Sequence, residues 1–241
     1  AVETGTPFIF VRDTVNRMNP NRHAGMIYAA NLCHEIAQNV GFSKQGSETI
    51  HPDGSITTTT ITGDMVTCNL NSINLGKITD EELEENIRLQ IRMLDNVISI
   101  NQFPVSEARV TSEKYRAIGL GTSGYHHYLV RHNLTWESDA HIEAADKLFE
   151  DIAYYAIKAS MELAKEKGSY PAFEGSEWQT GKYFERRGYT SPRWQQLKAD
   201  VAKYGMRNGY LMAIAPTGST SNIANTTAGI DPIFKKFFIE E

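Results

Sequence analysis

The sequence predicts an α/β fold, and three observations along the chain support this class. Short apolar runs and turns dominate residues 1–78, long amphipathic repeats dominate residues 79–167, and residues 192–221 combine a helical pattern, an apolar run and a polar turn. Strands that alternate with helices in this way are typical of α/β proteins. With 241 residues, 41% of them hydrophobic, the chain is long enough to bury a core without disulfide bonds.

The first third of the chain predicts short strands and turns. Short apolar runs at residues 7–11 and 26–30 are expected to form buried strands. Residues 51–54 (HPDG) have the composition of a turn, and residues 55–61 after them alternate β-branched side chains. We therefore expect a strand at 55–61, at an exposed edge or in a hairpin, and a further turn at residues 63–64.

Two long helices are expected in the middle of the chain. Thr79 and Glu82 have the spacing of a capping box, and Pro104 is expected to close the helix that follows. The apolar stripe of this helix comprises Leu83, Ile87, Ile91, Leu94 and Ile98. The second helix is expected to start near Ser138 and to end at Gly168. Its buried face is expected to comprise Ile142, Ala145, Phe149, Ile152, Ala156, Ala159 and Leu163.

The last third predicts a helix at residues 192–204, a strand at 210–215 and a small polar turn at 216–221. Backbone N–H groups and hydroxyls of Thr217, Gly218, Ser219 and Thr220 in this turn could hold a phosphate. The turn contains no lysine, so magnesium-triphosphate catalysis is not its expected use. An ordinary capped helix start remains the alternative interpretation of the turn.

Charge and composition exclude several classes of protein. The formal net charge is −5 and no block of lysine or arginine occurs, so nucleic acid is not an expected partner. No run approaches the ~20 apolar residues of a membrane span, and the N-terminus does not resemble a signal peptide. Two cysteines are too few for a disulfide scaffold, which predicts reduced thiols and a cytoplasmic location. The chain does not begin with methionine, so we expect a processed product or a piece of a longer protein.

The clearest chemical pattern lies at residues 31–35 (NLCHE), directly after an apolar run. In an extended chain side chains alternate, so Asn31, Cys33 and Glu35 would project to one side. That face would combine a hydrogen-bonding amide, a nucleophilic or one-electron sulfur and a carboxylate base. The second cysteine, Cys68, is too distant in sequence for a C-x-x-C redox pair, and its spatial position cannot be deduced from spacing. Gln38 replaces the second histidine of an H-E-x-x-H zinc motif, so no metal site is expected here.

A glycine motif offers an alternative site. Gly119, Gly121 and Gly124 match G-x-G-x-x-G, the fingerprint of nicotinamide-dependent oxidoreductases. That motif must follow a strand, whereas residues 111–112 (TS) predict the start of a helix before the glycines. A glycine-rich helix that a neighbouring element approaches closely is the other interpretation.

Several motifs together resemble the catalytic large subunit of class I ribonucleotide reductase, over essentially all 241 residues. The motifs occur in the same order at residues 14–20 (TVNRMNP), 31–36 (NLCHEI), 68–75 (CNLNSINL), 116–121 (RAIGLG), 164–168 (AKEKG) and 215–219 (APTGS). The resemblance implies that residues 1–241 form part of a ten-stranded α/β barrel, with a finger loop near 31–35 and a phosphate loop near 216–221. It also implies that the glycine motif serves packing.

The resemblance assigns roles to the candidate residues. Cys33 matches the cysteine that carries a thiyl radical, Glu35 the base for the 3′-hydroxyl and Asn31 the amide that hydrogen-bonds the sugar. Cys68 matches one of two reducing thiols. Residues 217–220 match the loop that binds the phosphates of a ribonucleoside diphosphate.

The resemblance also implies what this chain needs from elsewhere. The second reducing cysteine, the effector segments and the tyrosines that pass the radical have no counterpart in this sequence. We therefore expect a chain that carries the rest of the large subunit, a metal-containing small subunit that supplies the radical, and an external thiol reductant of the thioredoxin or glutaredoxin type. No cofactor is expected to bind this chain itself. A non-catalytic fragment that only binds a partner is the remaining alternative.

Overall fold

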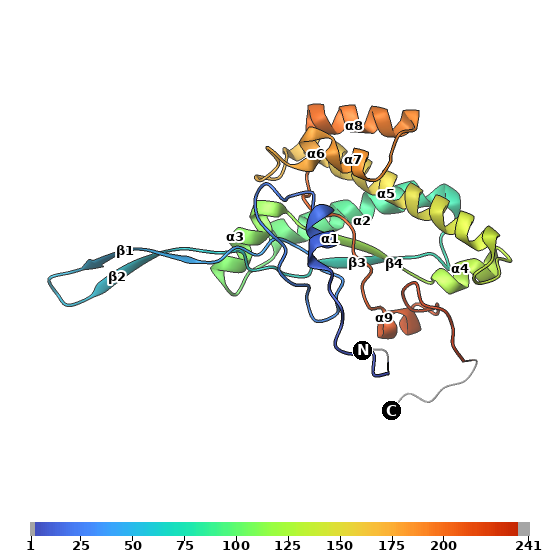
Figure 1. Cartoon of the computed structure of the whole chain (residues 1–241), viewed down its shortest axis with the longest axis horizontal. Coiled ribbons are helices and arrows are strands. Elements are labelled where there is room, and N and C mark those ends of the chain that lie inside the picture. The colour runs from blue at the N-terminus through green and yellow to red at the C-terminus, as the bar shows by residue number, and fades with distance from the viewer. Residues whose placement is uncertain (1–2, 236–241) are drawn as a thin grey trace.

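Parallel strands lie at the centre of the fold in the computed structural model, which describes residues 3–235 (Figure 1). Strand β3 (Leu70–Asn74) pairs in parallel with β4 (Gly119–Ser123), so that Asn74 lies opposite Ser123. Residues 210–215 run parallel beside β4 through a single bridge between Leu120 and Met212. These parallel segments, connected by helices, confirm the predicted α/β class.

The predicted strand at residues 210–215 is formed only in part. Its side chains alternate as in a strand, with Leu211 and Ala213 buried and Met212 and Ile214 exposed. Three backbone hydrogen bonds of 2.8–3.0 Å join it to Ile118 and Leu120. No strand pairs with its other edge among the described residues, and its pairing with β4 is a single bridge instead of a full ladder.

Helix α2 (Asp80–Ile100) confirms the first predicted helix. The capping box is present, since the Glu82 carboxylate accepts a hydrogen bond of 3.0 Å from the Thr79 N–H. All five residues of the predicted stripe are buried. The helix ends at Ile100 because Asn101 is extended, so the predicted end at Pro104 is wrong by a few residues.

Helix α5 (Asp139–Lys167) confirms the second predicted helix. The Ser138 hydroxyl caps it by accepting from the His141 N–H, and Gly168 ends it with a positive φ of 81°. Most of the predicted buried face packs in the core, but Ile142 is 60% exposed, because in this first turn the neighbouring His141 faces the core and contacts the Tyr125 hydroxyl at 2.8 Å. Helix α8 (Pro192–Tyr204) confirms the third prediction.

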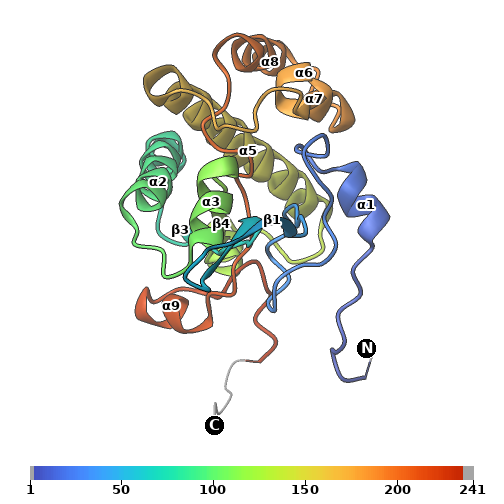
Figure 2. The ribbon, with the colours of Figure 1, turned by 90° about the vertical axis from the view of Figure 1, so that its left-hand side faces the viewer.

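Figures 1 and 2 show how the helices enclose the parallel strands. Helices α2 and α5 pack together along one face, and α6 (Glu177–Thr180), α7 (Lys182–Arg186) and α8 lie beyond α5. On the opposite side lies α9 (Gly218–Ile223), while α3 (Ser106–Tyr115) and α4 (Tyr125–Arg131) flank β4 in sequence. Within residues 3–235, no helix has the length and apolar character that crossing a bilayer requires.

The glycine-rich stretch is a strand and not a helix, which corrects the sequence-based expectation. Helix α3 starts at Ser106 and ends at Tyr115, where Arg116 adopts a left-handed conformation with φ of 44°. This turn redirects the chain into β4 before Gly119. A Cβ at Gly121 would collide with the backbone oxygen of Ala213, so glycine permits the close approach of two parallel segments.

The N-terminal third departs most from prediction. Neither residues 7–11 nor 26–30 form a strand, because neither finds a pairing segment in the described part of the chain. The first run is largely exposed and leads into helix α1 (Arg12–Arg17). The predicted strand at 55–61 is confirmed, and of its two expected settings the structure shows the hairpin. Strands β1 (Lys44–Ile50) and β2 (Ile56–Ile61) pair antiparallel, are exposed throughout and project away from the body (Figure 1).

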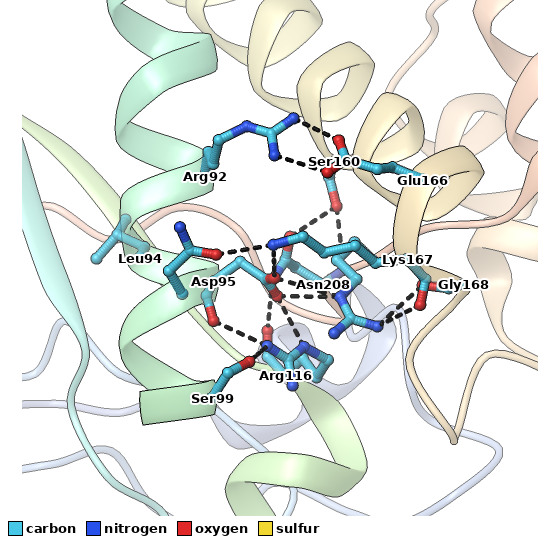
Figure 3. A network of polar contacts seen from close by, with 12 residues as sticks. Arg92, Leu94, Asp95, Ser99, Arg116, Ser160, Glu166, Lys167, Gly168 and Asn208 are labelled. Carbon is cyan, nitrogen blue, oxygen red and sulfur yellow. Dashed lines mark hydrogen bonds and ion pairs between the residues drawn. The ribbon is translucent and has the colours of Figure 1, made fainter. Parts of the chain in front are cut away.

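A buried ionic cluster ties the helix ends together (Figure 3). Asp95 of α2 is fully buried, and its carboxylate accepts from Arg116 at 2.7 Å and from Arg207 at 3.2 Å. Lys167 at the end of α5 lies 3.7 Å away, and Asn208 donates to the same carboxylate at 3.3 Å. One carboxylate thus fixes the segments that lead into β4 and into residues 210–215.

Candidate active site

Cys33 lies at the tip of a tight turn, so the predicted extended geometry of residues 31–35 is wrong. The His34 N–H donates to the Asn31 carbonyl at 3.1 Å, and His34 has a positive φ of 69°. The Asn31 side chain closes the loop by accepting from the Ile36 N–H at 3.0 Å. Both Leu32 and Cys33 are exposed at the tip. The turn therefore presents the Cys33 thiol by loop geometry and not by strand alternation.

Buried asparagines hold the two stems of this turn without a strand ladder. Asn19 donates to the Asn39 side chain at 2.8 Å, and Asn39 donates to the Asn21 carbonyl at 2.8 Å. Asn21 in turn donates to the Gly209 carbonyl at 2.8 Å, which anchors the loop to the core. Such side chains replace the missing backbone partners. The prediction missed them, although asparagines at positions 16, 19 and 21 are a visible signal.

The fold brings Cys68 next to the turn, which spacing along the sequence could not establish. The Asn31 amide nitrogen lies 3.6 Å from the Cys68 sulfur. Both cysteines are free and exposed. Partial burial raises the pKa of the Cys68 thiol, and the nearby Glu35 carboxylate and Cys33 raise it further, while the Asn31 contact opposes them. This environment therefore disfavours the Cys68 thiolate relative to an ordinary exposed cysteine.

This environment predicts a pH dependence for Cys68. Glu35→Gln removes a negative charge that disfavours the thiolate, so the pKa of Cys68 should fall toward its ordinary value. Alkylation requires the thiolate, so its rate should begin to rise at lower pH in this variant than in the parent. Iodoacetamide labelling between pH 6 and about 10, read by mass spectrometry at Cys68, measures the shift. An unchanged profile would contradict the proximity of Glu35.

A cleft of about 510 Å³ connects the turn with the polar loop near α9. Cys33 and Glu35 line it from the turn, Asn74 and Ser123 from the ends of β3 and β4, and Thr217 from the polar loop. One carboxylate oxygen of Glu35 is inaccessible and has no hydrogen-bond partner within residues 3–235. A buried acceptor without a donor is costly, so this carboxylate is left with unused hydrogen-bonding capacity.

Only some of the residues predicted to bind phosphate, 217–220, line the cleft. Thr217 is buried, and its hydroxyl accepts from the Gly229 N–H at 2.7 Å. Thr217 and Thr220 line the cleft, whereas Gly218 and Ser219 are exposed and lie outside its lining. The prediction missed Asn74 and Ser123. The Asn74 side-chain oxygen also has no hydrogen-bond partner in the described part of the chain.

The three glycines of the fingerprint serve packing. Gly119 and Gly121 lie inside β4, where a dinucleotide fingerprint would require them after the strand. A Cβ at Gly119 would lie 2.5 Å from a methyl carbon of Leu70. Gly124 starts α4 with a positive φ of 73°. These contacts explain the glycines without a cofactor, and the nicotinamide interpretation is not supported.

Fold and site together define an α/β protein in which a free thiol and a carboxylate line one cleft, with a second free thiol beside the same turn. The family model described as "Ribonucleotide reductase, barrel domain" matches residues 1–241, and the chain belongs to this family. The resemblance seen in the sequence motifs is thereby confirmed.

Three relatives share the description "Ribonucleoside-diphosphate reductase subunit alpha". The protein of Treponema pallidum (strain Nichols) is 55% identical over 246 residues, covering all of this chain and 29% of the relative. That of Helicobacter pylori (strain ATCC 700392 / 26695) is 38% identical over 289 residues, covering 99% of this chain and 37% of the relative. That of Bacillus subtilis (strain 168) is 31% identical over 262 residues, covering 99% of this chain and 36% of the relative. The chain thus spans roughly a third of these relatives.

Proposed function

We propose that this chain forms part of the catalytic subunit of a ribonucleotide reductase. The reaction is the radical reduction of a ribonucleoside diphosphate to the deoxyribonucleoside diphosphate. The observation that supports it best is the joint lining of one cleft by Cys33, Glu35 and Thr217, with Cys68 beside Asn31. Relatives named as ribonucleoside-diphosphate reductase alpha subunits point to the same activity.

The proposed chemistry divides between the two cysteines and the carboxylate. Cys33, as a thiyl radical, takes the 3′ hydrogen atom of the ribose, and Glu35 accepts the proton of the 3′-hydroxyl. Asn31 hydrogen-bonds the sugar hydroxyls. The 2′-hydroxyl then leaves as water, and Cys68 with a second thiol supplies two electrons and protons and ends as a disulfide. Finally, Glu35 returns its proton to O3′, and Cys33 returns a hydrogen atom to C3′ and becomes a thiyl radical again.

The arrangement of the thiols fits these roles. Cys33 is presented at an exposed tip, where a radical can arrive and a substrate can dock. The environment that raises the pKa of the Cys68 thiol favours the protonated form, which a hydrogen donor requires. Only two cysteines occur in residues 1–241, so the second reducing thiol is proposed to come from outside this sequence.

The proposed assembly supplies the groups that the reaction needs and that this sequence does not contain. Residues 1–241 form part of a ten-stranded barrel, with residues 31–35 as its finger loop. The remaining large-subunit segment completes the barrel, a metal-containing small subunit generates the radical, and a thioredoxin-like or glutaredoxin-like thiol re-reduces the disulfide. The exposed apolar side chains near the cleft, such as Leu32 at 90% exposure and Ile223 at 87%, support further protein covering this face.

Residues 217–220 are proposed to bind the substrate phosphates, and Thr220→Val tests this. Thr220 is exposed at the cleft, so the substitution removes its hydroxyl, which donates to the Thr217 carbonyl at 3.2 Å, without opening the core. Loss of one hydrogen bond to a charged phosphate should weaken nucleoside diphosphate binding by about tenfold or more. Equilibrium dialysis with the assembled enzyme measures this constant. Thr190→Val, an exposed threonine outside the cleft, is the matched control, and equal affinity in both variants would argue against the phosphate loop.

A further inference from the structure

A second pocket, separate from the cleft, is lined by several positively charged side chains. Its volume is about 370 Å³, and it shares no lining residue with the 510 Å³ cleft. It lies where residues 22–23 meet helices α6 and α7. We call it the basic pocket, and its charged and polar lining comprises Arg22, His23, Glu177, Thr180, Lys182 and Arg186.

A buried carboxylate organises the basic pocket. The Glu177 side chain is only 4% exposed, and its backbone N–H donates to the Pro20 carbonyl at 2.8 Å. Arg186 donates to both of its carboxylate oxygens at 3.0–3.1 Å. Arg22 approaches the same carboxylate at 3.8 Å. Glu177 therefore holds two guanidinium groups at the wall of one cavity.

The charges of the basic pocket do not balance. Arg22, Lys182 and Arg186 contribute three positive charges, and Glu177 contributes the one negative charge of the lining. Lys182 is exposed and forms no ion pair within the described residues. This excess occurs in a chain whose net charge is −5, so it is a local feature and not a consequence of composition.

We propose that the basic pocket binds a phosphate group. Guanidinium groups match the geometry of phosphate oxygens, and the net excess of two positive charges in the lining matches a phosphate dianion. The cavity volume lies near the lower end of about 300–1,000 Å³ for small-molecule sites, so a small phosphate ester fits as well as the free ion. This site is independent of the proposed reaction.

Isothermal titration calorimetry on the complete polypeptide that carries this chain tests the proposal. The probes are inorganic phosphate and ribose 5-phosphate, with ribose as the unphosphorylated control. Lys182→Glu should weaken phosphate binding by about tenfold or more, since it removes one charge-assisted contact and adds repulsion. Lys147→Glu makes the same charge change on an exposed lysine outside the pocket and should bind like the parent. Tighter binding of ribose 5-phosphate than of phosphate would identify an ester as the ligand, and the reverse would identify the free ion.

The controls separate this site from the cleft and from misfolding. Thr220→Val should leave binding at the basic pocket unchanged, whether or not it affects nucleotide binding. Lys182 is exposed and unpaired, so its variant should keep the parent melting temperature. Absence of phosphate binding up to about 10 mM, tenfold above a 1 mM dissociation constant, would overturn the proposal. Equal affinities of the Lys182→Glu and Lys147→Glu variants would overturn it as well.

Discussion

Replacing Cys33 by serine is expected to abolish deoxynucleotide formation by the assembled enzyme. An alcohol O–H bond is much stronger than a thiol S–H bond, so a serine cannot carry the radical that Cys33 is proposed to hold. Turnover should fall by more than about 10³-fold, which corresponds to about 4 kcal/mol of activation free energy. Substrate binding should change little, because Cys33 is exposed at the turn and serine is of similar size.

Cys68→Ser is the matched control for this substitution. It also blocks deoxynucleotide formation, but it leaves Cys33 able to take the 3′ hydrogen. Release of tritium from 3′-labelled substrate should therefore persist in Cys68→Ser and disappear in Cys33→Ser. Residual deoxynucleotide from the Cys33→Ser enzyme would contradict the proposed role of this cysteine.

Asp95→Asn is expected to produce the largest loss of stability. The carboxylate is fully buried and is shared by Arg116 and Arg207, with Lys167 nearby (Figure 3). Asparagine has the same size but carries no charge, and its amide nitrogen would face the donors that now bind a carboxylate oxygen. Breaking a buried ion pair from one side costs about 3–5 kcal/mol, since the remaining charges lose their partner.

Urea denaturation followed by circular dichroism measures this loss. Glu166→Gln provides the control, because Glu166 pairs with Arg92 at the surface. An exposed pair contributes about 1 kcal/mol or less. A loss of stability in Asp95→Asn no larger than that in Glu166→Gln would mean that the buried cluster does not hold the helix ends together.

Local sequence signals predicted the helices well because those helices depend on local features. A cap such as Ser138 involves residues within one helical turn, and the apolar residues of α2 recur every three or four positions, so both signals are visible in short stretches of sequence. The hairpin was equally accessible, since residues 51–54 encode its turn. Where a segment relies on distant partners, prediction failed. Residues 7–11 and 26–30 have strand-like composition but meet no pairing strand among the described residues.

In the candidate site too, local features could be predicted from the sequence and long-range contacts could not. Cys33 and Glu35 could be selected from the sequence, but their arrangement depends on a turn closed by the Asn31 side chain. The contact between Asn31 and Cys68 joins residues that lie 37 positions apart. Only the fold sets such a distance. The basic pocket likewise joins residues 22–23 to α6 and α7, far along the chain, so charge patterning could not indicate it.

Disulfide mapping after a single turnover tests the proposed division of labour between the cysteines most directly. The assembled enzyme is mixed with one equivalent of ribonucleoside diphosphate without external reductant, quenched at low pH, alkylated and analysed by mass spectrometry. We expect Cys68 in a disulfide with a cysteine outside residues 1–241, Cys33 as a free thiol, and one deoxynucleotide formed per disulfide. A disulfide between Cys33 and Cys68 as the turnover product would contradict the account, because the proposed radical carrier would then be a reducing thiol.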